Sequence, residues 1–236
     1  MDFFGYNKPN QILVCREFKI TSFSYLLLFF LLVIWPLSII IFLSPALSNL
    51  EQPVTNLIIR FYLPTLIFQM IVFCALSMII KKENSHIASV GFDKFKYIYI
   101  SYALIFLLVA GILLKLFSEL INRLEIADFV KPEIMSPRSW YEIAVWIILS
   151  AVVAIVEESA YRGYLITRLT KLFKSRIAAM LIASLAFSAG HFYQGYGGVL
   201  LIFAYGVLFA GLFLYTRSIW PGILAHFIHN IIAPFI

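Results

Sequence analysis

The sequence has few charged residues. Only 13% of its 236 residues are Asp, Glu, Lys or Arg, whereas 62% are hydrophobic and the mean hydropathy is +0.95. Soluble domains have about 25% charged and about 45–50% apolar residues. The composition therefore excludes an ordinary soluble domain and predicts an integral membrane protein with little mass outside the bilayer. No polar linker interrupts the apolar segments, so we expect one compact membrane domain.

Cysteine is scarce too, and internal repeats are absent. Cys15 and Cys74 lie far apart and show neither paired metal-ligand spacing nor a disulfide framework. The lack of repeats argues against a transporter built from two related halves. The net charge of +6 could suggest a nucleic-acid partner. In a membrane protein it more often reflects basic cytoplasmic loops beside anionic lipid, so no nucleic-acid partner is expected.

Seven apolar segments predict an all-α integral membrane protein, a polytopic bundle of about seven transmembrane helices. The segments cover residues 22–43, 57–80, 97–117, 140–168, 177–194, 198–215 and 221–232. The first is longer than the apolar core of about 7–15 residues in a signal peptide, so we expect it to be retained. Residues 1–139 then hold an N-terminal cytoplasmic segment and three helices, and residues 140–236 hold the other four.

The loop charges predict the orientation in the membrane. Basic residues precede the first segment and follow the second, fourth and sixth, whereas the alternate loops are neutral or mixed. Cytoplasmic loops carry an excess of Lys and Arg. The N-terminus is therefore expected in the cytoplasm and the C-terminus outside. Without a targeting extension, the chain is expected to be a multi-pass protein of a bacterial cell membrane.

The fourth apolar segment contains two adjacent glutamates, Glu157 and Glu158, followed by Arg162. A charged residue at the centre of a membrane helix costs about 2.5–3.5 kcal/mol on insertion scales, so these charges should face the protein interior and have a function. Glu158 and Arg162 are four residues apart and can pair on one helix face. Glu157, rotated by about 100° on an α-helix, can face a cavity instead.

Two later segments contain further polar residues, namely His191 in the fifth and His226, His229 and Asn230 in the seventh. Counted at about 1.5 Å per residue from the basic residue at each helix end, Glu157, His191, His226 and Asn230 lie at depths of roughly 16, 22, 14 and 20 Å. Similar depths predict one shared, water-accessible cavity on the cytoplasmic side of the membrane midplane. For His229 a packing contact is expected.

These residue types suit hydrolysis without a serine or cysteine nucleophile. A carboxylate in an apolar site can take a proton from water near neutral pH, and a histidine can share that water. His226 and Asn230 could donate hydrogen bonds to an oxyanion. A zinc site of Glu157, His191 and His226 is an alternative, although no HExxH spacing is present. Interhelical hydrogen bonds remain the structural alternative for His191 and Asn230.

Three motifs in these segments resemble those of a known family. Residues 157–162 match EExxxR, residues 187–191 match FxxxH and residues 226–230 match HxxxN. In this order, over residues 140–236, they resemble the CAAX-protease and bacteriocin-processing family of intramembrane endopeptidases. The resemblance implies a multi-helix membrane fold and hydrolysis of a peptide bond in a membrane-associated protein or peptide. It favours a metal-free mechanism, with zinc possible.

The resemblance also implies roles for the motif residues. Glu157 and His191 would activate the attacking water, and His226 and Asn230 would stabilise the oxyanion. Glu158 and Arg162 would support the site. Two alternatives from other classes stay open, a non-catalytic immunity or scaffold protein with the same fold and a proton-coupled transporter, because intramembrane Glu and His also form proton relays. The sequence does not specify the oligomeric state.

Overall fold

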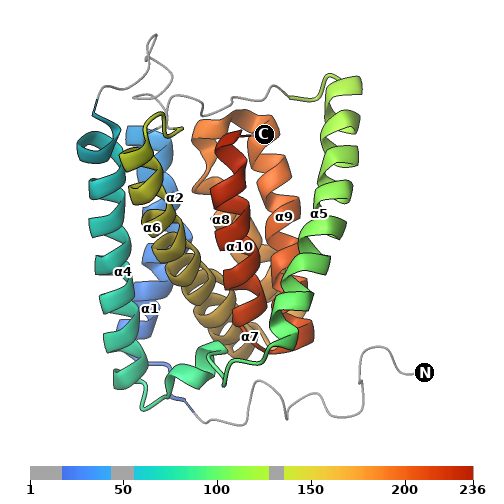
Figure 1. Ribbon diagram of the computed structural model, residues 1–236. Helices are drawn as coiled ribbons and strands as arrows, with labels where there is room; N and C mark the ends of the chain where they lie inside the picture. The colour runs from blue at the N-terminus through green and yellow to red at the C-terminus, as the bar shows by residue number, and fades with distance from the viewer. Residues whose placement is uncertain (1–17, 44–55, 128–135, 236) are drawn as a thin grey trace.

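The computed structural model describes residues 18–43, 56–127 and 136–235. Within these ranges the chain forms seven helical rods that alternate in direction, and it contains no strand (Figure 1). The all-α bundle predicted from the sequence is confirmed. Five of the rods in the described part of the chain are long and apolar enough to cross a membrane. The protein is therefore a multi-pass membrane protein.

The rods are continuous helices in which α-helical, π-helical and 3-10 turns follow one another. The first three rods and the linker before the third comprise α1 Ser22–Phe29, η1 Phe30–Ile34, α2 Trp35–Ser38, η2 Ile39–Leu43, η3 Ile58–Tyr62, α4 Leu63–Lys82, η4 Ile87–Val90 and α5 Ile98–Arg123. The remaining four comprise α6 Trp140–Glu157, η6 Glu158–Leu165, α7 Ile166–Phe173, α8 Arg176–Ala189, η7 Phe192–Gln194, α9 Gly195–Thr216, α10 Trp220–Ile232 and η8 Ala233–Phe235.

Several predicted helix boundaries were wrong. The third rod continues to Arg123, and the fourth continues to Phe173. The fifth ends at Ala189 instead of residue 194, which leaves α8 with 14 residues, and α10 has 13. A helix needs about 17–25 residues to span the hydrocarbon core, so α8 and α10 are shorter than full spans. Both pack against longer rods, α8 against α9 and α10 against α5 and α6.

The short helix α8 ends because its last turn is capped by a side chain. The His191 ring nitrogen Nδ1 lies 2.9 Å from the Phe187 carbonyl oxygen, which a continuing α-helix would offer to the backbone N–H of residue 191. That N–H instead donates to the Ser188 carbonyl. The motif histidine therefore lies in a turn between two helices, and its position on a regular helix was predicted wrongly.

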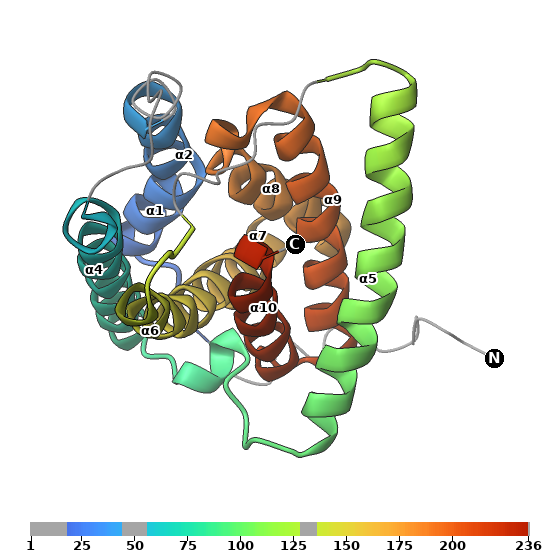
Figure 2. The same ribbon diagram turned by 45° about the horizontal axis from the view of Figure 1, so that its top comes forward.

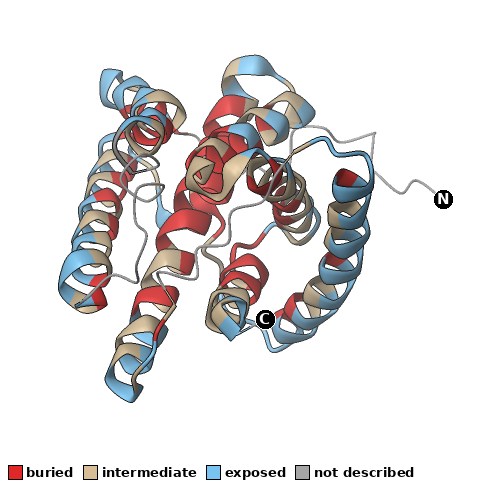
Figure 3. Ribbon diagram, turned by 90° about the horizontal axis from the view of Figure 1, so that it is seen from above, coloured by how far each residue is buried: buried red, intermediate tan, exposed pale blue. Residues whose placement is uncertain are grey.

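The bundle has an enclosed interior and a lipid-compatible exterior. With the top of the bundle tilted forward, the rods containing α1, α4, α6, α10, α9 and α8 are seen around the interior, while α5 packs outside α9 and α10 (Figure 2). Buried residues face inward and exposed residues outward (Figure 3). On α5 only Tyr99, Ala103, Ala110 and Ile121 are buried, and its exposed side chains are mostly large and apolar. A lipid environment accommodates such a surface.

Small residues allow α8 and α9 to pack closely. A Cβ atom added to Gly206 on α9 would lie 3.2 Å from the Ser184 Cβ atom on α8. That distance leaves almost no space for a larger residue. Close backbone approach of this kind is how membrane helices with small-xxx-small spacing associate.

A buried ion pair fixes the end of the bundle that carries the basic loops. Arg168 on α7 donates to Glu83, with Nη2 2.5 Å from Oε2, and both side chains have no exposed surface. Tyr164 and Ser24 donate their hydroxyl groups to the other Glu83 oxygen at 3.0 and 2.8 Å. The network therefore ties the first, second and fourth rods together. Because every oxygen of Glu83 is used, we assign it a structural role.

Candidate active site

The paired glutamates lie where an α-helix changes into a π-helix. Glu157 is the last residue of α6, and the eight residues of η6 that follow are all buried. The expectation of regular α-helical geometry through the motif was therefore wrong. Hydroxyl groups compete for backbone carbonyls here, since Ser159 donates to Ile155 at 2.5 Å and Thr167 donates to Gly163 at 2.6 Å. Such π-helical turns are rare and are frequent at functional sites.

Glu158 is fully engaged by neighbouring groups. Its Oε1 atom lies 3.1 Å from Nη1 of Arg162 and accepts a hydrogen bond from His226 Nδ1 at 3.0 Å. Its Oε2 atom packs on α10, where a Cβ atom added to Gly222 would lie only 2.8 Å away. The predicted pairing of Glu158 with Arg162 is present, and both side chains are at most 2% exposed.

Arg162 is held by aromatic rings as well as by Glu158. Its guanidinium lies 4.2 Å from the centre of the Phe187 ring and 5.0 Å from that of Phe209. The contact with Glu158 is close enough for an ion pair, but neither terminal nitrogen has hydrogen-bond geometry. The faces of the two rings attract the guanidinium cation electrostatically, although its terminal nitrogens make no hydrogen bond. The first aromatic residue of the FxxxH motif thus positions the arginine of the EExxxR motif.

Glu157 has one oxygen bound and one oxygen available. Gln69 on α4 donates from Nε2 to Glu157 Oε1 at 3.0 Å. The Oε2 atom is buried, has no hydrogen-bond partner and lies 3.9 Å from His226 Nε2. A carboxylate with one oxygen anchored and the other unpaired is arranged to receive a proton or to bind water.

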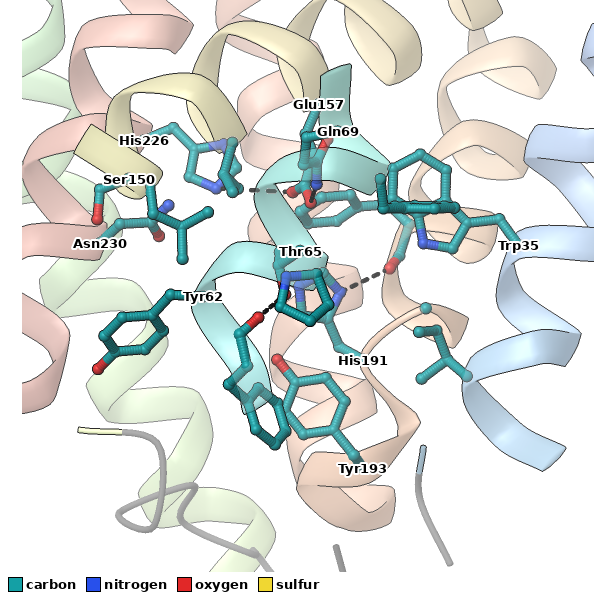
Figure 4. A pocket seen from close by; sticks show the side chains of 18 of the residues that line it. Trp35, Tyr62, Thr65, Gln69, Ser150, Glu157, His191, Tyr193, His226 and Asn230 are labelled. Carbon is teal, nitrogen blue, oxygen red and sulfur yellow. Dashed lines mark hydrogen bonds and ion pairs between the residues drawn. The ribbon is translucent and has the colours of Figure 1, made fainter. Parts of the chain in front are cut away.

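A cavity of about 430 Å³ lies in front of Glu157 (Figure 4). Glu157, His191, His226 and Asn230 all line it, so the structure brings together the four residues that the motifs single out. Glu158 and Arg162 are not among the lining residues. The rest of the wall is mainly aromatic and aliphatic, including Trp35, Phe61, Phe68, Trp146, Leu149 and Phe187. Apolar walls with a few convergent polar groups are typical of ligand sites.

The two histidines each have one ring nitrogen occupied. His191 Nδ1 is bound to the Phe187 carbonyl and His226 Nδ1 to Glu158, which leaves Nε2 of each ring for other partners. A carboxylate and a carbonyl oxygen only accept hydrogen bonds, so Nδ1 carries the proton in both rings. Asn230 is held by its backbone, whose carbonyl accepts a hydrogen bond from Trp146 Nε1 at 2.9 Å. Its side chain is half-buried at the cavity wall.

The cavity lies in the half of the bundle away from the basic loops. Its wall uses the first half of α4, most of α6, the turn after α8 and the later part of α10. The basic residues lie at the opposite ends of these helices, for example Lys82 at the end of α4 and Arg176 at the start of α8. Our expectation that the cavity would lie on the side of the basic loops was therefore wrong.

Sequence reasoning missed three polar participants. Gln69 is 2% exposed and its Oε1 atom has no partner, and the hydroxyl group of Ser150 in the same cavity has none either. Tyr193 also lines the cavity, just after His191. An amide in the apolar run of α4 was a usable signal, because polar residues within membrane helices are by default candidates for function.

The described residues do not form a preorganised metal site. Among residues 18–43, 56–127 and 136–235, no three His, Cys, Asp or Glu side chains converge closely enough to hold an ion. Nε2 of His191, Nε2 of His226 and the free oxygen of Glu157 do belong to side chains that line the cavity. A zinc ion on Glu157, His191 and His226 would therefore require these side chains to move together.

Comparison with known proteins finds one family that is similar to the motif-bearing part of the chain. Residues 139–232 match the model of type II CAAX prenyl endopeptidases that are Rce1-like. No curated protein and no solved structure matches the chain. The matched segment contains the last four rods and every motif residue that lines the cavity. The last four rods are therefore similar to the Rce1-like type II CAAX prenyl endopeptidases, a family of membrane proteases.

Proposed function

We propose that the protein is an intramembrane endopeptidase that hydrolyses a peptide bond of a membrane-associated protein or peptide with water activated by Glu157. The observation that carries this proposal is the unpaired, buried Oε2 atom of Glu157 facing a cavity that two histidines and an asparagine also line. The similarity of residues 139–232 to a family of endopeptidases supports the reaction class.

In the proposed mechanism, water binds between Glu157 Oε2 and His191 Nε2. Glu157 takes a proton as the water oxygen attacks the carbonyl carbon of the scissile bond. The carbonyl oxygen becomes an oxyanion and accepts hydrogen bonds from the Asn230 amide and, when it is protonated, from His226 Nε2. The protonated Glu157 then gives its proton to the leaving nitrogen as the C–N bond breaks. Glu158 keeps the His226 ring in place throughout.

We also propose that the chain lies in a bacterial cell membrane with its N-terminus in the cytoplasm. The distribution of basic residues along the sequence supports this orientation. The proposed mechanism requires no cofactor. Its partners are the lipid bilayer and the membrane-associated substrate.

The test compares the membrane proteomes of cells that produce the wild-type protein with those of cells that produce Glu157→Gln. A substrate should be cleaved only by the wild-type protein. Glu119→Gln, on the exposed face of α5, is the matched control and should cleave normally. Purified Glu157→Gln should melt like the wild type, because Gln69 can still hydrogen bond to the new amide oxygen. Unchanged cleavage by Glu157→Gln would favour a scaffold or a transporter instead.

A further inference from the structure

The described charges are distributed unequally between the two ends of the bundle. The end where α4, α7 and α9 finish has ten basic residues, which are Lys19, Lys81, Lys82, Lys94, Lys96, Arg168, Lys171, Lys174, Arg176 and Arg217. The only acidic residues described at that end are Glu83 and Asp93. The other end has four basic residues, Arg60, Lys115, Arg123 and Arg138, against Glu119, Glu125 and Glu142.

Such an excess of Lys and Arg in short loops marks the cytoplasmic side of a membrane protein. The cavity wall, by contrast, is built from the other end of each helix. On α4 it includes Thr65 and Gln69, which are 17 and 13 residues before Lys82. At about 1.5 Å per residue, these side chains lie roughly 26 and 20 Å from the basic end of that helix. The hydrocarbon core is about 30 Å thick, so the cavity extends from the midplane toward the opposite surface.

The polar groups at the cavity wall become more accessible along the same direction. Glu157 and His226 are buried, while His191, Tyr193 and Asn230, which lie nearer the opposite end, are half-buried. The half-buried Ser38 lines the cavity from the first rod at a similar level. Accessibility of the cavity wall therefore increases from Glu157 toward the end that carries the mixed charges.

We propose that the cavity opens to the extracytoplasmic side and that the substrate is a membrane-anchored polypeptide whose scissile bond enters from that side. This inference rests on the proposed function for its substrate class and on the charge distribution for its direction. The apolar cavity wall suits a segment with apolar side chains next to the scissile bond. The bond must reach about the middle of the membrane, where Glu157 lies near the centre of the helical rod Trp140–Phe173.

The test measures which side of the membrane reaches thiols placed in the cavity. In a background carrying Cys15→Ser and Cys74→Ser, Ser38→Cys and Thr65→Cys place a thiol in the cavity wall from two different rods. Lys94→Cys, exposed between η4 and α5, is the control for the basic end. A small, charged, membrane-impermeant thiol reagent is added to right-side-out and to inverted vesicles that contain the full-length protein.

We expect Ser38→Cys and Thr65→Cys to be labelled in right-side-out vesicles and to lose that labelling in inverted ones, with Lys94→Cys showing the reverse. Labelling of both cavity thiols only from the cytoplasmic side would overturn the inference. So would failure of both to label from either side when the detergent-unfolded protein shows the thiols to be intact. Cleavage that depends on Glu157 together with cytoplasmic labelling would refute this inference alone. Extracytoplasmic labelling with cleavage that does not depend on Glu157 would refute the proposed function.

Discussion

The substitution Glu158→Gln separates the structural glutamate from the proposed catalytic one. Glu158 is 1% exposed, lies 3.1 Å from Arg162 Nη1 and accepts a hydrogen bond from His226 Nδ1 at 3.0 Å. Glutamine preserves the shape of this side chain but removes its charge. Arg162, which is 2% exposed, would then be a buried cation without a counter-ion.

The loss of stability can be estimated from these contacts. Removing one partner of a buried ion pair costs about 3–5 kcal/mol of the free energy of unfolding. The rings of Phe187 and Phe209 still flank the Arg162 guanidinium in the variant and retain a cation–π attraction of about 0.5–2 kcal/mol. We therefore expect a loss near the lower limit, about 3 kcal/mol. At about 2–4 °C per kcal/mol for a chain of this size, Tm should fall by about 6–12 °C.

The assay is thermal unfolding in detergent, followed by tryptophan fluorescence, beside a cleavage assay. The double variant Glu158→Gln with Arg162→Met should recover part of the lost stability, because the unpaired charge is gone. Glu119→Gln on α5 is the matched control and should leave Tm unchanged. Glu157→Gln should abolish turnover and leave Tm nearly intact. The reasoning is refuted if Glu158→Gln melts like the wild type without turnover while Glu157→Gln is the destabilised variant.

Three further predictions concern the surroundings of the site. Gln69→Leu removes a hydrogen bond to a charged Glu157, worth about 1.5–3 kcal/mol, and should lower kcat about 10- to 100-fold; an unchanged kcat would show that the amide does not position the carboxylate. Gly163→Ala places a Cβ atom 2.4 Å from the Val90 carbonyl oxygen and should lower stability by about 3 kcal/mol, whereas Gly211→Ala, with nothing within 4 Å, should be neutral or stabilising in chemical denaturation. Active protein should contain substoichiometric zinc by elemental analysis; one zinc per chain, with chelation removing activity, would contradict this prediction.

The residues of the candidate site were easier to predict from the sequence than the position of the site in the membrane. Glu157, His191 and His226 were identifiable because polar residues are costly within apolar helices and therefore few. Their depth was predicted by counting from one helix end only. His191 lies 15 residues after Arg176, which exceeds the 14 residues of α8, so it lies beyond the far end of its helix. Assigning the cavity to one side of the membrane requires the helix lengths, which a periodic apolar pattern does not determine.

The π-helical geometry of the motif could not be predicted from sequence patterns either. An EExxxR spacing places Glu158 and Arg162 on one face of an α-helix, and they are paired in the π-helical form as well. The same pattern is therefore compatible with both backbones. What distinguishes them is tertiary contact, because Gly163 must approach the Val90 backbone closely and a residue 73 positions earlier supplies that surface. Long-range contacts of this kind are not encoded in a local motif.

The first rods complete the site, although the family match begins only at residue 139. Gln69 anchors the proposed catalytic carboxylate, Glu83 holds Arg168, and Val90 receives Gly163. These contacts hold the chain just before, within and just after the π-helical segment. Such segments are rare and usually short, so the tertiary contacts stabilise this one. Buried ion pairs seldom add net stability compared with apolar packing, so their benefit here is the fixed position of the motif. A catalytic constellation is most accurate when rigid elements hold it, and the first two rods, with the linker after them, supply that support.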